Sequence, residues 1–141
     1  MSGIVVGQVL WLKIRFNNFG TVAQTKHPCL VVAVEDDYIE IAHCDSLAGK
    51  EHKAAMKANF VIFCDNPVET VFDKDGFAQL DNIILLENFA ALSSYRRTTD
   101  KLSTDKLINL LNAYRNYHSR YSIDENKIIF MDEAEIKSLN P

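Results

Sequence analysis

Short apolar segments recur along this chain, separated by polar stretches with turn signals, and this spacing restricts the fold more than any other feature. Segment 4–16 ends in alternating apolar and polar positions, which is the period of a β-strand. The runs 29–34 and 38–44 flank the acidic turn 35–37, and we predict that they form a hairpin. Because most connections are too short for helical crossovers, we expect the strands to pair antiparallel.

Further apolar runs continue this pattern toward the C-terminus. Segments 59–64 and 77–87 are typical of strands, and so is the shorter run 127–131. Between them, residues 68–72 alternate like an edge strand. The sequence therefore predicts a mainly β fold of the α+β class, built on a small barrel-like antiparallel sheet.

The clearest helical pattern follows residue 103. Ser103 is a predicted N-cap, and Asp105 places a negative charge in the first turn. Large side chains then recur at i, i+3 and i+4 spacing, namely Leu107, Leu110, Leu111, Tyr114, His118 and Tyr121. Segment 132–139 begins with acidic residues and predicts a second, shorter helix.

Composition is typical of a single globular domain, with 141 residues of which 48% are hydrophobic. Cys29, Cys44 and Cys64 form no Cys-x-x-Cys pair and lie in or beside apolar runs, which favours a reducing compartment. The first residues lack the basic region of a signal peptide, and no apolar stretch approaches the roughly 20 residues that span a membrane. We therefore expect a cytoplasmic protein.

Charge is unevenly distributed along the chain. The net charge is −4, yet the segment 1–34 has no acidic residue and contains Lys13, Arg15 and Lys26. That segment carries +3, which leaves −7 for the remainder. The N-terminal part can therefore attract an anion even though the whole chain is acidic.

Several motifs follow one another in a recognisable order. A Gly-x-[Val/Leu/Ile]-x-Trp strand, "GQVLWLKI" (7–14), precedes a glycine-containing loop and "KHPCLVV" (26–32). Later come "DGFAQLDNIILL" (75–86) and "YRRTTDKLSTDKLINLL" (95–111). In this order the sequence resembles the MazF/PemK family of toxin–antitoxin endoribonucleases, within the CcdB/MazF superfamily. The resemblance spans roughly residues 7–118.

The resemblance implies an SH3-like antiparallel barrel with a C-terminal helix, over residues 1–121. Residues 122–141 are then an extension of the same domain. The implied activity is metal-independent cleavage of single-stranded mRNA by attack of its own 2′-hydroxyl group. The implied partners are a cognate antitoxin and a second copy of the chain in a homodimer, with no membrane and no cofactor.

The candidate catalytic residues lie where the family places an arginine before proline and a Thr or Ser after the next strand. Here those positions hold His27-Pro28 and Asp45-Ser46. Histidine can accept and release a proton near neutral pH, Lys26 can supply the positive charge of the missing arginine, and a carboxylate can orient an imidazole. The alternative is that His27 belongs to an ordinary loop and that Asp45 and Ser46 only cap a turn.

Other polar residues are candidates for RNA contacts. Basic and amide side chains that lead into or follow the predicted barrel strands can hold phosphates and base edges. They are Lys13, Arg15, Asn17, Asn18, Arg96 and Arg97. The residues His27, His43, Asp45 and His52 match no standard metal-ligand spacing, so we expect no metal site.

A non-enzymatic role stays open. CcdB-type toxins share the implied fold and act by binding DNA gyrase, so the fold alone does not decide the activity. The histidine in place of arginine and the acidic net charge favour a binding protein or an inactive scaffold. The basic N-terminal segment and the position of His27 favour the nuclease.

Overall fold

The computed structural model describes residues 2–54, 56–62 and 75–141. Within these ranges the strands are β1 (Val9–Leu12), β2 (His27–Val34), β3 (Tyr38–Ser46), β4 (Asn59–Ile62), β5 (Gly76–Gln79), β6 (Ile83–Glu87) and β7 (Ile128–Met131). The helices are α1 (Glu51–Ala54), α2 (Thr104–Arg120) and α3 (Glu133–Leu139), with two short 3-10 helices, η1 (Ala90–Tyr95) and η2 (Glu125–Lys127). The predicted edge strand at 68–72 and Cys64 lie outside the described residues.

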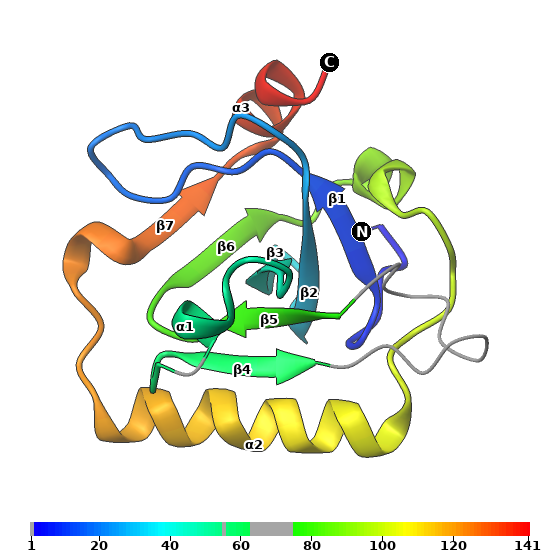
Figure 1. The fold of residues 1–141 in the computed structure, drawn as a ribbon. Helices are drawn as coiled ribbons and strands as arrows, with labels where there is room; N and C mark the ends of the chain where they lie inside the picture. The colour runs from blue at the N-terminus through cyan, green and yellow to red at the C-terminus, as the bar shows by residue number, and fades with distance from the viewer. Residues whose placement is uncertain (1, 55, 63–74) are drawn as a thin grey trace.

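The described strands form one mostly antiparallel sheet with β3 at its centre (Figure 1). One side of β3 pairs with β2, which in turn pairs with β1. The other side pairs with β6 over the first half of β3 and with β5 over its last residues. The structure thus confirms the predicted mainly β, α+β class.

The pairing of β6 with β7 is parallel and departs from the antiparallel expectation. Its physical reason is the connection between the two strands, which includes η1 and the long helix α2. A connection of that length can return the chain in the same direction, whereas a short turn cannot.

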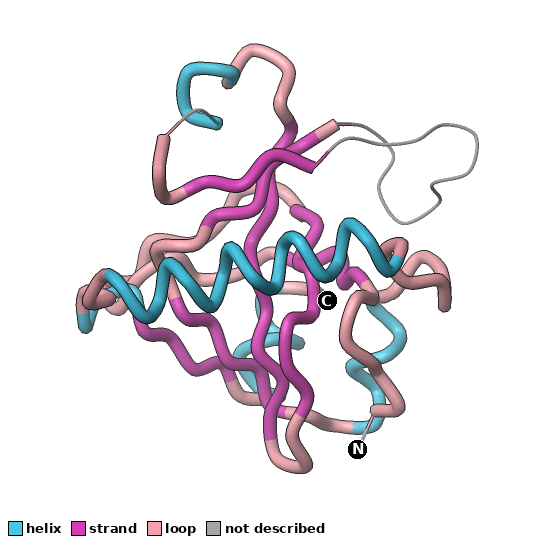
Figure 2. Tube along the Cα trace, turned by 90° about the horizontal axis from the view of Figure 1, so that it is seen from below, coloured by secondary structure: helices cyan, strands magenta, loops and turns pink. Residues whose placement is uncertain are grey.

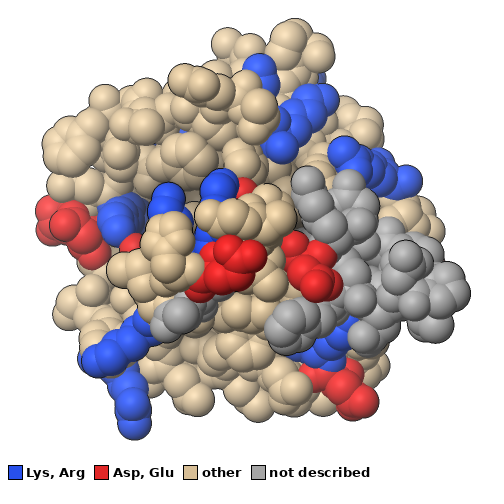
Figure 3. Space-filling view, in the orientation of Figure 1, with Lys and Arg blue, Asp and Glu red and all other residues tan. Residues whose placement is uncertain are grey.

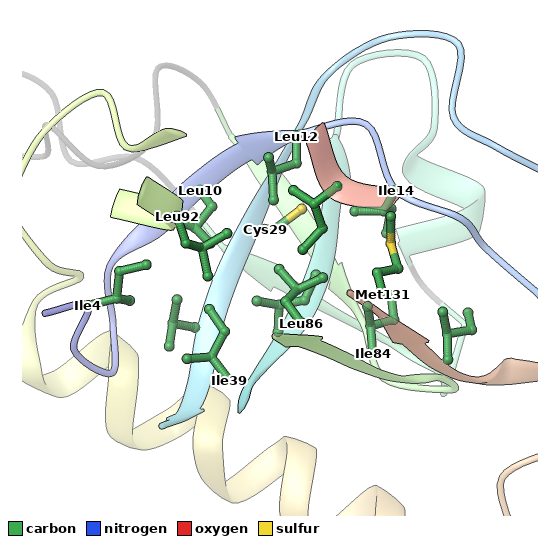
Figure 4. Close-up of a cluster of buried hydrophobic side chains, with 14 of the residues drawn as sticks. Ile4, Leu10, Leu12, Ile14, Cys29, Ile39, Ile84, Leu86, Leu92 and Met131 are labelled. Carbon is green, nitrogen blue, oxygen red and sulfur yellow. The ribbon is translucent and has the colours of Figure 1, made fainter. Parts of the chain in front are cut away.

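Side chains along the strands alternate between two core clusters on opposite faces of the sheet. On β2, Cys29 and Val31 belong to the first cluster, while Leu30 and Val32 belong to the second. The first cluster gathers side chains from β1, β2, β3, β6 and β7, and from η1 through Leu92 (Figure 4). This alternation is the pattern that predicted the strands.

Helix α2 covers the second cluster and crosses the strands on their outer face (Figure 2). Leu110 and Tyr114 are its buried residues, at the predicted helical spacing. The helix begins directly after Ser103, as predicted, although the Ser103 side chain makes no capping hydrogen bond. Tyr121 follows the last helical residue and is exposed, so the apolar stripe ends before it.

The segment after residue 121 packs against the rest of the chain. Strand β7 extends the sheet beside β6, and Ile136 of α3 is buried in the first core cluster. Asp132 caps α3 by accepting a hydrogen bond from the backbone of Glu135. Asn140 bonds both the amide and the carbonyl of Lys13, which ties the end of α3 to the chain after β1.

Two predicted strands are shorter in the structure. Only Val9–Leu12 of the segment 4–16 joins the ladder with β2, because the chain then turns into the loop 17–25. The run 77–87 divides into β5 and β6 around Leu80–Asn82. The two halves pair with different parts of β3, which a single straight strand cannot do.

Candidate functional site

Antiparallel pairing brings the start of β2 next to the end of β3. Cys29 lies opposite His43 in the register, so the residues before Cys29 lie beside those after His43. His27 and Asp45 occupy these two positions, and alternation places them on the same face as the first core cluster. The structure therefore brings together two of the predicted catalytic residues.

His27 and Asp45 form the centre of a small charged group. The Nδ1 atom of His27 lies 3.8 Å from Oδ1 of Asp45, beyond direct hydrogen bonding but close enough for an ion pair when the ring is protonated. The Nε2 atom of His27 lies 3.3 Å from the Thr25 hydroxyl oxygen. The other carboxylate oxygen of Asp45 accepts a 2.6 Å hydrogen bond from Lys50.

These contacts keep Asp45 ionised. Partial burial raises the pKa of Asp45, but hydrogen bonds from Lys50 and from the Ser46 amide outweigh it and hold that pKa below its ordinary value. The Ser46 amide donates to Oδ1 over 2.8 Å. The negative charge beside His27 is therefore present throughout the neutral range.

His43 lies directly beneath this group and is unusual for a buried histidine. Only 1% of the residue is exposed, and neither ring nitrogen has a hydrogen-bond partner. Its ring centroid lies 4.8 Å from that of His27 and 4.9 Å from that of Phe16, which meets it edge-on. The Gln79 side chain approaches the ring without reaching hydrogen-bond geometry.

Burial determines the charge state of His43. Desolvation and the neighbouring His27 lower the pKa of His43 to about 3, against smaller opposing effects of Asp45 and Gln79. The ring is therefore neutral at pH 7. It can orient the His27 ring by contact without adding a competing positive charge.

Lys26 and Ser46 flank the pair. Lys26 is exposed one residue before His27, and the Ser46 side chain is half-buried one residue after Asp45. Gly76 pairs with Ser46, and a Cβ atom at this glycine would lie only 2.5 Å from the carbonyl oxygen of Asp45.

Three of the residues predicted to contact RNA form hydrogen bonds with other parts of the chain. Arg15 bonds both carboxylate oxygens of Glu135 and the carbonyl of Phe130. The Asn18 amide donates to the carbonyls of Glu125 and Ile128, so it and Arg15 bond the backbone of β7 and of the residues before it. Asn17 accepts from two amides within its own loop.

The remaining residues that were predicted to contact RNA lie around β1. Arg96 bonds the Gln8 side chain, and the guanidinium carbon of Arg97 lies 3.6 Å from the centre of the Trp11 ring. Lys13 is half-buried, and its backbone bonds Asn140.

Charges on the visible surface are mixed. On the face seen in Figure 3, basic and acidic side chains are interspersed. Any attraction of an anion on that face would therefore come from local groups of side chains rather than from a broad field.

No protein-family model matches this sequence, and no curated protein is significantly similar to it.

Two kinds of feature are not found within the described ranges. No three His, Cys, Asp or Glu side chains there lie close enough together to hold a metal ion. No helix in the same ranges combines the length and apolar character needed to cross a bilayer.

Lys50 and Gln79 are the site residues that sequence reasoning missed. Lys50 reaches Asp45 because the chain turns back after β3, where Gly49 has a φ of 76° and the Lys50 amide bonds the Leu47 carbonyl. The dipeptide Gly49-Lys50 shortly after Asp45 is a weak local signal of that turn. The position of Gln79 depends on the pairing of β5 with β3, for which the sequence holds no local signal.

Proposed function

We propose that this chain is a MazF/PemK-like toxin, a metal-independent endoribonuclease that cleaves single-stranded RNA and is neutralised by a cognate antitoxin. The proposal includes an SH3-like barrel of the CcdB/MazF type and a homodimer. Its main support is the 3.8 Å approach of His27 to Asp45, at the place where the resembled family has its arginine before proline.

The reaction needs a base, a means of stabilising charge on the phosphate, and a proton for the leaving group. Neutral His27 accepts the proton of the 2′-hydroxyl while that oxygen bonds to the adjacent phosphorus. The bond from phosphorus to the 5′ oxygen then breaks, and the departing oxygen takes a proton from water. The products are a 2′,3′-cyclic phosphate and a free 5′-hydroxyl.

Each neighbouring side chain has a definite part in this scheme. Asp45 stabilises the imidazolium that forms on His27, and Lys50 keeps Asp45 ionised. Lys26 offers positive charge to the phosphorane, and the Ser46 hydroxyl donates to a phosphate oxygen. These roles replace the fixed charge of an arginine by a group that moves a proton.

The test is cleavage of a fluorescent single-stranded RNA in the presence of EDTA. We expect the wild-type chain to produce cyclic phosphate ends and His27→Ala to be slower by about 10²–10⁴-fold, the usual contribution of a general base. His52→Gln is the matched control, since His52 is an exposed histidine on α1 to which this scheme assigns no role. Equal rates for wild type and His27→Ala, with both folded, would remove His27 from the mechanism.

A non-catalytic binding protein is the second candidate, and one observation favours it. Phe19, Ile128 and Phe130 are 78%, 43% and 51% exposed, and Asn18 joins their two segments through the Ile128 carbonyl. Exposed apolar side chains on adjoining segments suit a protein contact. If no RNA is cut and gyrase or another defined protein binds in a direct assay, this alternative replaces the nuclease.

A further inference from the structure

A hollow lies between β4 and the C-terminal half of α2. Its volume is about 630 Å³, and it is open to solvent on one side. Figure 1 shows β4 running beside α2, and the two elements are in contact. The residues that matter to the argument are Lys57, Phe60, Asn116, Tyr117, Arg120 and Tyr121.

Aromatic rings form much of the wall. Tyr117 and Tyr121 lie with ring centroids 4.8 Å apart and tilted by 37°, and Phe60 comes from the facing strand. Tyr121 is 39% exposed, so part of its ring is available to a ligand. Planar bases stack on such rings, and each stacked base typically changes affinity by roughly 5- to 150-fold.

The charge of the hollow is positive. Lys57 and Arg120 are both exposed and form no ion pair within the described residues. Among the described residues that line the hollow, none is acidic. Nearby Asp81 is paired with Lys127 over 2.7 Å. The C-terminus of a helix contributes only about −0.5 of a charge, which is less than the two full positive charges of Lys57 and Arg120.

We propose that this hollow binds a nucleotide. The base stacks against Tyr117 and Tyr121, the phosphate bonds Lys57 and Arg120, and the exposed amide of Asn116 meets polar edges of the base or sugar. The nucleotide is either free or part of a single strand, since both present the same ring and phosphate. The inference does not depend on cleavage at His27.

The experiment uses two probes on the full chain. The first is 5′-AMP, measured by titration calorimetry, and the second is a fluorescein-labelled 2′-O-methyl decanucleotide, measured by anisotropy. The 2′-O-methyl group prevents cleavage by 2′-hydroxyl attack. Saturable binding of AMP identifies a free nucleotide as ligand, whereas binding of the decanucleotide alone identifies a single strand.

Variants then locate the site. We expect Arg120→Gln and Tyr121→Ala each to weaken binding by at least ~5-fold. Arg115→Gln is the matched control, because Arg115 is exposed on the same helix but lines a different hollow. It should change affinity less than twofold. RNA cleavage is assayed separately, so a loss of binding in Arg120→Gln is distinguished from a failure of the proposed cleavage at His27.

Two results would overturn the proposal. One is the absence of saturable binding for both probes by the folded wild-type chain. The other is an equal loss of affinity in Arg115→Gln and Arg120→Gln, which would mean attraction by general charge alone. Circular dichroism of each variant verifies that a loss of binding is not a loss of fold.

Discussion

The buried ring of His43 should make this protein lose stability in mildly acidic solution. The unfolded chain takes up a proton on this histidine with a pKa near 6.5, whereas burial lowers the pKa of folded His43 to about 3. Below pH 6.5 the unfolded state therefore binds more protons than the folded state. Stability from this group is complete above pH 6.5 and is lost as the pH falls toward 3.

The size of the effect follows from these two pKa values. Between pH 7 and pH 5 the free energy of unfolding should fall by about 2 kcal/mol because of His43 alone. His27, Asp45 and Lys50 also face this ring, and they remain in a variant that changes only residue 43. The difference between wild type and variant therefore isolates the His43 contribution.

His43→Leu removes the group that titrates and places an apolar side chain on the face shared with Ile39 and Ile41. At pH 7 it should also be more stable than wild type by about 1 kcal/mol, because two buried nitrogens without partners are removed. His43→Gln is the control, since it does not titrate but retains buried polar atoms. The His43→Gln variant should lose the pH dependence of stability but should not be more stable than wild type at pH 7.

Urea denaturation at pH 7 and pH 5, followed by fluorescence of the single tryptophan, measures these quantities. Trp11 is half-buried beneath Arg97, so unfolding changes its surroundings. If His43→Leu loses as much stability from pH 7 to pH 5 as wild type does, the reasoning from burial is refuted.

Three further predictions concern the fold around the site. Gly76→Ala should lower the free energy of unfolding by about 1–3 kcal/mol and slow any RNA cleavage, because the added Cβ would press on the Asp45 carbonyl. Urea denaturation measures this, and unchanged stability would contradict it. Asn140→Ala removes the bonds between α3 and the chain after β1 and should cost about 1–3 kcal/mol, seen as a lower Tm than wild type. Burial raises the pKa of Cys44 to about 12 and that of Cys29 well above its ordinary value, so iodoacetamide should label neither thiol until urea is added. Peptide mass mapping after labelling at pH 8 measures this, and rapid labelling of either cysteine in the folded protein would contradict the prediction.

The proximity of His27 and Asp45 was within reach of sequence reasoning. The runs 29–34 and 38–44 around a short acidic turn predicted a hairpin, and a hairpin places the start of one strand beside the end of the next. Alternation then placed Asp45 on the face of His43. The candidate pair follows from these two local rules.

The hydrogen bonds that the predicted RNA-binding residues form within the chain were not predictable in the same way. Arg15 and Asn18 are polar loop residues in the sequence, and nothing near them indicates that they bond the backbone of β7 and the residues before it. Those partners lie more than a hundred positions away along the chain. Local polarity indicates that a side chain can bond, but not with which partner.

The sequence by itself determined the mainly β class, the hairpin of β2 and β3, and the position of α2, because periods of 2 and 3.6 are properties of neighbouring residues. Only the tertiary structure decided that β7 pairs in parallel with β6, that Lys50 closes on Asp45, and that His43 lies buried without partners. These outcomes depend on which distant segments exclude water together. That is a property of the packed chain as a whole and not of any short stretch of it.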